Sequence, residues 1–336
     1  MSKPAKNTAE PLSPLDQLSV DLDTEMRAVN ALIIERMDSP VKLIPQLASY
    51  LIAAGGKRIR PLLTLASTSI YNGDMQRAHK LAAAVEFIHT ATLLHDDVVD
   101  ESEQRRGQDA ANLVFGNQAS VLVGDFLFSR AFQLMTEDGS IDVLNVLANA
   151  SAVIAQGEVL QLSTANTLNN GLDIYLEVIR SKTAALFAAA CEVGPMVSDA
   201  APAHAKALSD YGMNMGIAFQ IADDTLDYTA DEQSLGKTVG DDFREGKATA
   251  PVLLSLKDAD ADEMAFWERV LVENKQTPDD LQKALEIINR HDGFAKANDL
   301  ALEYKDKALA ALNAAPDSVF KTHLENLADY VVSRSF

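Results

Sequence analysis

The chain has 336 residues, of which 47% are hydrophobic and 23% charged, so it is long enough for one large domain or two ordinary ones. Its net charge of −20 excludes a general nucleic-acid binder, which would carry a basic face, and disfavours broad electrostatic attachment to an anionic membrane. The single cysteine, Cys191, rules out an intramolecular disulfide and is expected to pack in the core of a cytoplasmic protein.

The first segment, residues 1–18, is polar and lacks the apolar core of a signal peptide. We therefore expect a flexible tail, followed by one domain that spans 19–336. No run of about 18 apolar residues follows, so we expect no transmembrane span.

Almost every later apolar segment is long, rich in Ala and Leu, and spaced at intervals of three and four residues, as in amphipathic helices. No clear alternating pattern predicts strands, and glycines and prolines separate the segments without an evident linker between domains. The sequence therefore predicts one all-α domain of roughly ten to twelve helices around a deep central cavity. The clearest helical segments are 74–101, 141–163 and 172–193.

The segment 74–101 ends in a concentration of acids. Asp96 and Asp100 are four residues apart, so their carboxylates project from one face of the helix and repel one another. Asp97 lies between them, and acids at a helix C-terminus also oppose the helix dipole. Taken alone, this pattern is typical of a solvated helix end on the surface.

A second apolar helix ends in the same way, with Asp223, Asp224 and Asp227 in "GIAFQIADDTLDY". Solvation alone is a poor explanation for two such pairs. Facing one another across a cavity, they could hold several hard cations through oxygen ligands. Mg²⁺ fits best, because it accepts one or two carboxylates and completes its octahedron with water and phosphate oxygens.

The few basic residues cluster in two short turns. Lys57 and Arg60 follow a Gly-Gly pair and flank the start of a helix at Pro61, and Arg105 and Arg106 follow the first acid cluster. A site with metal-binding acids on one side and bare Lys and Arg side chains on the other is suited to two phosphate groups. The two groups would be bound in different ways. Mg²⁺ would bridge one of them to the carboxylates, and guanidinium and ammonium groups would bind the other directly.

With these motifs the chain resembles the trans-isoprenyl diphosphate synthases, from about residue 25 to its end. "GGKRIRP", "LLHDDVVDESEQRRG", "GDFLFSRAF", "KTAAL", "FQIADDTLDY" and "GKTVGDDFREGKATAP" occur in that family's order. Within the family it looks most similar to bacterial synthases of the octaprenyl and decaprenyl type, which make the side chains of quinones such as ubiquinone. The resemblance implies the isoprenoid synthase fold, a prenyltransferase with three Mg²⁺ ions per active site, and a homodimer.

The resemblance also implies roles for individual residues. Mg²⁺ would bind to Asp96, Asp100 and Asp223. Asp97, Asp224 and Asp227 would support these ligands or share in the coordination of the metal. Isopentenyl diphosphate would bind to Lys57, Arg60, His89 and Arg106, and the allylic diphosphate to Arg105, Lys182, Lys237 and Lys247. The reacting carbon would lie against Thr183 and Gln220. The candidates for catalysis are Asp96, Asp100, Asp223, Lys182 and Arg105.

The apolar residues before Asp96 are expected to line the growing product, because one helical turn rises about 5.4 Å, close to one isoprene unit. Ala91 and Thr92, one turn before the acids, are small and leave the channel open, and Ile88 flanks it further on. Leu147 is the candidate for its floor, with ordinary core packing as the alternative. The resemblance to long-chain synthases implies a product of about C40–C50, and an open channel is consistent with that length.

Several other functions remain open at this point. A shorter-chain farnesyl or geranylgeranyl diphosphate synthase shares all these motifs, and a non-catalytic subunit of a heteromeric synthase typically loses an aspartate-rich motif that this chain keeps. A class I terpene cyclase would mix Asn, Ser and Glu in its second metal motif. An HD-type phosphohydrolase at His95 and Asp96 would need further His ligands in matching positions. The segment "GDFLFSRAFQLM" predicts core or dimer interface, and transient membrane contact is expected for product release.

Overall fold

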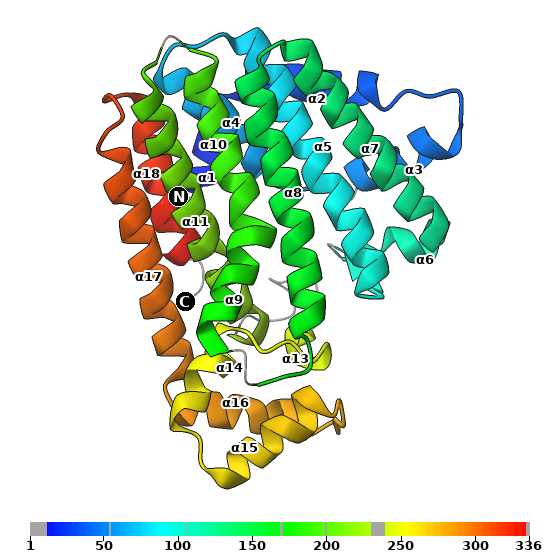
Figure 1. Cartoon of the computed structure of the whole chain (residues 1–336), viewed down its shortest axis with the longest axis vertical. Helices are drawn as coiled ribbons and strands as arrows, with labels where there is room; N and C mark the ends of the chain where they lie inside the picture. Colours follow the sequence, from blue (N-terminus) through cyan, green and yellow to red (C-terminus); the bar gives the residue numbers. More distant parts are fainter. Residues whose placement is uncertain are drawn as a thin grey trace, which may run out of the picture.

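Helix α5 (Met75–Val99) lies at the centre of the structure and is buried over most of its length (Figure 1). Asp74 caps its N-terminus by accepting hydrogen bonds from the backbone N–H groups of Gln76 and Arg77. Every residue from 81 to 88 is buried, as expected of a helix surrounded by others rather than one with a single apolar stripe. This computed structural model describes residues 12–53, 55–105, 107–168, 171–198, 200–229 and 239–333.

Long helices pack around α5 and confirm the all-α prediction. Its direct neighbours are α2 (Asp23–Arg36), α4 (Ile59–Ile70), α7 (Asn117–Asp138) and α10 (Ala185–Met196). Beyond α10 lie α8 (Ile141–Thr164), α11 (Pro202–Thr229), α17 (Gly293–Leu312) and α18 (Val319–Ser333). Glycine permits the closest crossing of α10 and α11, because a Cβ on Gly212 would lie 2.4 Å from the Phe187 carbonyl oxygen.

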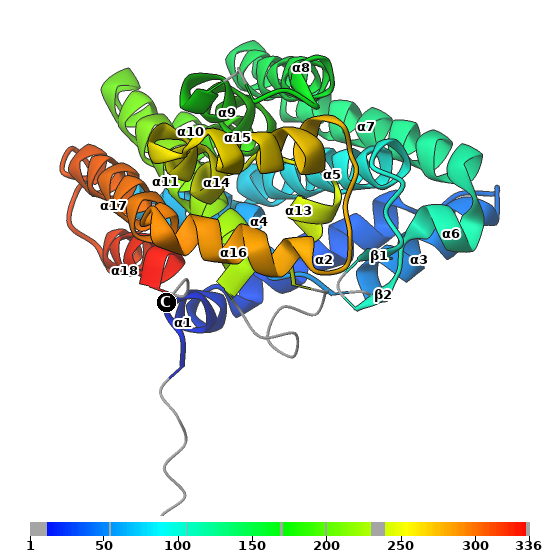
Figure 2. The same cartoon turned by 90° about the horizontal axis from the view of Figure 1, so that it is seen from below.

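A group of shorter helices gathers at one end of the bundle (Figure 1, Figure 2). The carboxyl ends of α8 and α11 lie at the same end of the bundle, so the acidic end of α11 is close to the loops that connect the shorter helices. The group consists of α13 (Asp241–Arg244), α14 (Ala250–Ser255), α15 (Ala261–Trp267) and α16 (Asp280–Arg290), with a 3₁₀ turn at Leu256–Asp258 and a π turn at Glu268–Val272.

Helix α1 (Pro14–Asp21) begins before residue 18, where the sequence predicted the end of a flexible tail. The Ser13 side chain caps it by accepting from the backbone N–H of Asp16. Leu15 and Leu18 are buried, because α1 packs against α18. The folded part of the chain therefore includes residues that were assigned to the tail, and residues 1–11 lie outside the described structure.

The described chain contains more helices than the ten to twelve expected, because continuous apolar stretches are interrupted. α1 and α2 are separated at Leu22, and α3 (Leu43–Ala53), α6 (Ala111–Phe115) and α9 (Gly171–Ile179) are short separate elements. The structure also contains a small antiparallel pair, β1 (Gln104–Arg105) with β2 (Gln108–Asp109), which the sequence did not predict. Strands of two residues are too short to show an alternating pattern.

Among the described residues one helix, α8, is long and apolar enough to cross a membrane by length and composition alone. Its Val143, Leu147, Ala150 and Ile154 pack in the hydrophobic core, so α8 is a core helix of this fold. Cys191 is fully buried, as predicted, and burial raises the pKa of its thiol to about 12.

Candidate active site

The acids at the end of α5 are held by lysines from distant parts of the chain. Lys182 Nζ lies 3.8 Å from Asp96 Oδ2 and 2.8 Å from Glu158 Oε2. Lys247 Nζ lies 3.1 Å from Asp100 Oδ2. Burial raises the pKa of Asp96 to about 7, although Lys182 opposes the rise, and the charges of Glu158 and Asp100 raise it further. The predicted repulsion between the paired acids is therefore present.

The acids at the end of α11 differ strongly in exposure. Asp223 is exposed, whereas Asp224 and Asp227 are buried. The Asp227 carboxylate accepts a hydrogen bond from the backbone N–H of Asp242 at 3.0 Å. Burial raises the pKa of Asp224 to about 6 against the opposing hydrogen bonds from Tyr175 and Gln220. Asp223 is thus the acid of this group that is exposed to solvent.

A short π-helical turn, η1 (Arg180–Ala184), brings the two acidic ends together. It lies between α9 and α10 and places Lys182 beside Asp96, while the next residue, Thr183, donates a hydrogen bond to Gln220 Oε1 on α11 at 2.9 Å. π turns within helices occur frequently at functional sites. Gly157 on α8 permits this approach, since a Cβ there would lie 2.7 Å from Ser181 Cβ.

The first basic turn lies beside the middle of α5. Arg60 Nη1 is 3.2 Å from His89 Nε2, and the Arg60 guanidinium lies 4.4 Å over the Phe187 ring. Lys57 is exposed, so its ammonium group is available to a ligand. The structure thus brings Arg60 and His89 into contact and leaves Lys57 exposed on the turn that precedes Arg60.

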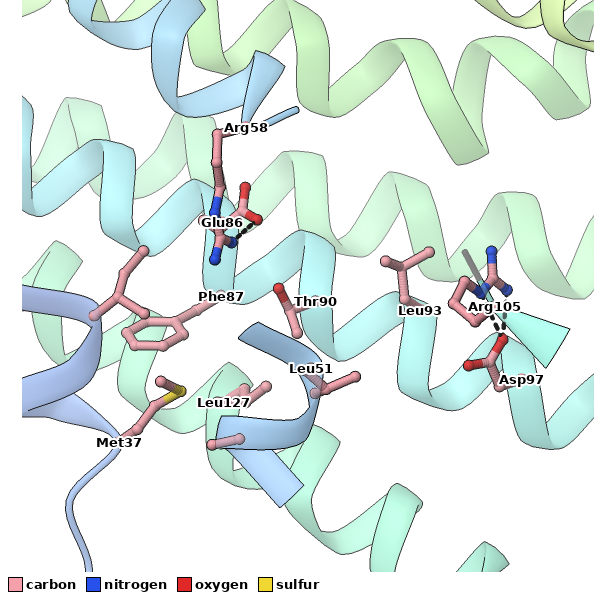
Figure 3. A pocket seen from close by; sticks show the side chains of 12 residues that line it. Met37, Leu51, Arg58, Glu86, Phe87, Thr90, Leu93, Asp97, Arg105 and Leu127 are labelled. Carbon is pink, nitrogen blue, oxygen red and sulfur yellow. Dashed lines mark hydrogen bonds and ion pairs between the residues drawn. The ribbon is translucent and has the colours of Figure 1, made fainter. Parts of the chain in front are cut away.

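Two buried acids on α5 hold the arginines of the two basic turns (Figure 3). Glu86 forms an ion pair with Arg58, which follows Lys57 and has left-handed backbone, φ 48°. Asp97 accepts from Arg105 Nε at 2.9 Å. Glu86 and Asp97 are eleven residues apart, about three helical turns, so they lie on the same side of α5. Both ion pairs line one narrow cavity between α2, α3, α5 and α7.

The comparisons with known proteins agree with this geometry. Residues 41–288 match the family model "Polyprenyl synthetase". The chain belongs to the polyprenyl synthetase family. It is 47% identical over 313 residues to the octaprenyl diphosphate synthase of Escherichia coli (strain K12), covering 92% of this chain and 96% of that one.

Two solved structures of polyprenyl synthases are similar over almost their whole length. A polyprenyl synthase from Caulobacter crescentus CB15, complexed with calcium and isoprenyl diphosphate, has a TM-score of 0.92 at 51% identity and covers 97% of this chain and 100% of its own. A decaprenyl diphosphate synthase from Rhodobacter capsulatus has a TM-score of 0.91 at 51% identity, with 96% and 100% covered. The protein is therefore a prenyltransferase with the isoprenoid synthase fold of this family.

The family uses a divalent metal, and the donor atoms at this site suit a hard cation. In the described part of the chain no three His, Cys, Asp or Glu side chains already stand together as a metal site. Instead, Lys182 and Lys247 lie against Asp96 and Asp100. The acids of the site nevertheless offer carboxylate oxygens, and among the described residues the buried Glu158 Oε1 has no hydrogen-bond partner. A cation bound to these acids would release the lysines and relieve the repulsion.

The residues predicted to line the product channel lie in the core beside the acids. Ala91, Ile88 and Leu147 are fully buried in one hydrophobic cluster, and the Thr92 hydroxyl donates to the His89 carbonyl at 2.8 Å. None of these four residues lines the cavity of Figure 3, which has a volume of about 40 Å³, enough for a few water molecules only. The role of Ala91, Thr92, Ile88 and Leu147 in setting product length stays a prediction.

Two predicted substrate residues, Arg106 and Lys237, lie outside the described residues. Sequence reasoning missed Tyr175, Glu86 and Gly157 as parts of the site. Tyr175 and Glu86 each contact a residue far away in the chain, so no local spacing shows their roles. Gly157 precedes Glu158 in a helical segment without turn residues, which is the one local signal that a backbone passes close by.

Proposed function

We propose that the protein is a long-chain trans-polyprenyl diphosphate synthase, which adds isopentenyl diphosphate units to an allylic diphosphate. The observation that carries the proposal is the meeting of both acidic helix ends at η1, beside the basic turn with Lys57, Arg60 and His89. The similarity to octaprenyl and decaprenyl diphosphate synthases supports a product of eight to ten isoprene units, and we propose that this product becomes a quinone side chain.

The reaction breaks the carbon–oxygen bond at the allylic C1 and leaves its electron pair on the diphosphate. The double bond of isopentenyl diphosphate then attacks the allylic cation and forms the new carbon–carbon bond. Loss of a proton to the departed diphosphate restores an allylic product for the next round. Lys182, Lys247 and Arg105 are already grouped around the acids, where negative charge develops on the leaving group. Lys57, Arg60 and His89 hold the second diphosphate at the basic turn.

Magnesium is the metal we propose, with three ions bound to Asp96, Asp100 and Asp223. When bound, Mg²⁺ neutralises the diphosphate and makes its departure easier. Asp97, Asp224 and Asp227 are buried and each accepts a hydrogen bond from a protein group, so we assign them the supporting part of the predicted role. Arg106 and Lys237 are proposed as further diphosphate ligands from the family pattern alone.

A homodimer is the oligomeric state we propose, because the outer faces of α6, α7 and α8 expose large apolar side chains. This exposed face contains Leu113, Val114, Leu122, Phe132, Val159 and Leu162. Contiguous exposed apolar patches mark interaction surfaces, and we propose that these side chains form one. A Leu122→Glu variant should shift the protein toward monomer in size-exclusion chromatography with light scattering, and an unchanged mass would contradict this interface. We also propose that the enzyme works in the cytoplasm and contacts the membrane transiently to release its product.

Incubation with Mg²⁺, radiolabelled isopentenyl diphosphate and farnesyl diphosphate tests the function, with the products separated by chain length. Linear products of eight to ten isoprene units support the proposal, and products that stop at three or four units support a shorter-chain synthase. Cyclic hydrocarbons indicate a terpene cyclase. The absence of any product from the folded protein alone indicates a subunit that needs a partner.

A further inference from the structure

A chain of hydrogen bonds links four side chains from α9, η1 and α11. The Tyr175 hydroxyl donates to Asp224 Oδ2 at 2.6 Å, Gln220 Nε2 donates to Asp224 Oδ1 at 2.7 Å, and the Thr183 hydroxyl donates to Gln220 Oε1 at 2.9 Å. Tyr175, Asp224 and Thr183 are buried. The chain therefore runs from α9, through the acidic motif of α11, to the π turn.

The direction of every bond in this chain follows from chemistry. A carboxylate only accepts hydrogen bonds, so Gln220 must turn its NH₂ group toward Asp224 and its carbonyl oxygen toward Thr183. Thr183 must then donate its only hydroxyl hydrogen to that carbonyl. At the other end, a backbone hydrogen bond from Ala250 at the start of α14 opposes the effect of burial, which raises the pKa of Tyr175. Tyr175 is thus held as a neutral donor to Asp224.

We propose that Tyr175 is a positioning residue, which fixes Thr183 so that it presents oxygen lone pairs, and no hydrogen, to the reacting carbon. This inference rests on the proposed function, which places Thr183 and Gln220 at that carbon. Positive charge develops on C1 of the allylic substrate as the carbon–oxygen bond breaks. Oriented acceptors stabilise that charge without reorganising, whereas a hydroxyl hydrogen pointed at C1 would oppose it.

Without the tyrosine hydroxyl, the Asp224 carboxylate loses one of its two side-chain donors and is free to turn. Gln220 then loses the fixed partner that sets its amide orientation, and a reversed amide would offer NH₂ to Thr183. Thr183 would accept from that NH₂ and turn its own hydrogen outward. The effect is therefore on the chemical step, and the binding of either diphosphate should not change.

The test compares Tyr175→Phe with Tyr211→Phe in the full-length enzyme. Tyr211 is the matched control, because it is also buried, lies on α11, and donates its hydroxyl to a backbone carbonyl, that of Leu324 at 2.7 Å. In single-turnover assays with radiolabelled isopentenyl diphosphate, Tyr175→Phe should lower the rate about 10- to 100-fold, as loss of an orienting partner typically does. KM for both diphosphates should stay within about twofold, and Tyr211→Phe should keep the wild-type rate.

A double-mutant cycle shows whether Tyr175 acts through Thr183. Thr183→Val removes the oxygen at nearly constant shape, and in that background Tyr175→Phe should change the rate by less than about twofold. Thr183→Ser, which keeps the hydroxyl, should retain the sensitivity to Tyr175→Phe. Independent, multiplicative effects of the two substitutions, or a wild-type rate for Tyr175→Phe, would overturn the inference while leaving the proposed function intact. A wild-type enzyme that makes no elongated product would refute the proposed function itself.

Discussion

Replacing Gly157 by alanine is expected to slow catalysis by displacing the π turn that carries Lys182 and Thr183. The new Cβ would lie 2.7 Å from Ser181 Cβ and 2.9 Å from the Lys182 backbone nitrogen. Carbon atoms in ordinary contact are about 3.5–4.0 Å apart, so α8 and η1 must separate by about 1 Å. Neither neighbouring atom is the end of a flexible side chain, and the displacement therefore has to involve the backbone.

A displacement of about 1 Å can lower a rate by roughly 100-fold, and we expect kcat to fall by about 10- to 100-fold. The stability change should be small by comparison. Overpacking costs about 1–3 kcal/mol, and replacing glycine by alanine in a helix returns about 1 kcal/mol. The thermal midpoint should therefore fall by only a few degrees.

Steady-state kinetics with labelled isopentenyl diphosphate, together with thermal unfolding, provides the measurement. Gln156→Ala is the matched control, because Gln156 precedes Gly157 on the same helix and is exposed. The control should keep wild-type kcat. A Gly157→Ala enzyme with wild-type kcat and KM would refute the argument that the glycine sets the position of η1.

Four further predictions follow from the site. Asp96→Ala should lower turnover by more than about 100-fold while the circular dichroism spectrum stays unchanged, and near-normal turnover would contradict the metal assignment. Burial raises the pKa of Asp96 to about 7, with Lys182 opposing it, so protons should compete with Mg²⁺ in the neutral range. The Mg²⁺-induced rise in the unfolding temperature should be larger at pH 8 than at pH 6. Equal Mg²⁺ effects at both pH values would contradict competition between protons and the metal at Asp96. Without metal, Asp96 should lower the stability of the folded chain as pH rises from about 4 to 7, because the folded chain binds the proton more tightly than the unfolded chain. Glu86→Gln should weaken the ion pair with Arg58 and raise KM for isopentenyl diphosphate about tenfold with little change in kcat. An unchanged KM would show that this ion pair is not needed to position the basic turn. Ala91→Phe should shorten the products to about C15–C20, because a bulky ring one helical turn before the acids blocks the channel; products of wild-type length would place the channel elsewhere.

The features that could be predicted from sequence are those encoded by local spacing. Helical periodicity gave the all-α class, and the four-residue interval of Asp96 and Asp100 gave two carboxylates on one face. Like-charge repulsion at that interval is a local property, and the charge of Asp100 contributes to the raised pKa of Asp96, of which burial is the largest cause. The family resemblance added the roles of basic residues that no spacing rule would have assigned.

The contacts that complete the site depend on tertiary packing and could not be predicted. Lys182 reaches Asp96 across 86 positions in the chain, and Tyr175 reaches Asp224 across 49. The π turn at Arg180–Ala184 lies in a segment whose composition is that of an ordinary helix. Glu86 likewise occupies a position on α5 where a helix commonly carries a charge, and only the fold shows that it is buried against Arg58.

The pairing of Lys182 and Lys247 with the acids of α5 has a consequence for the order of ligand binding. Each lysine now neutralises a carboxylate that we assign to Mg²⁺, and each is also assigned to the diphosphate. A cation that binds first releases both lysines, and a diphosphate that binds first removes the lysines from the acids. Either ligand therefore prepares the site for the other, and by linkage the gain in affinity must be equal in both directions. The empty protein should bind metal or diphosphate weakly alone and both strongly together.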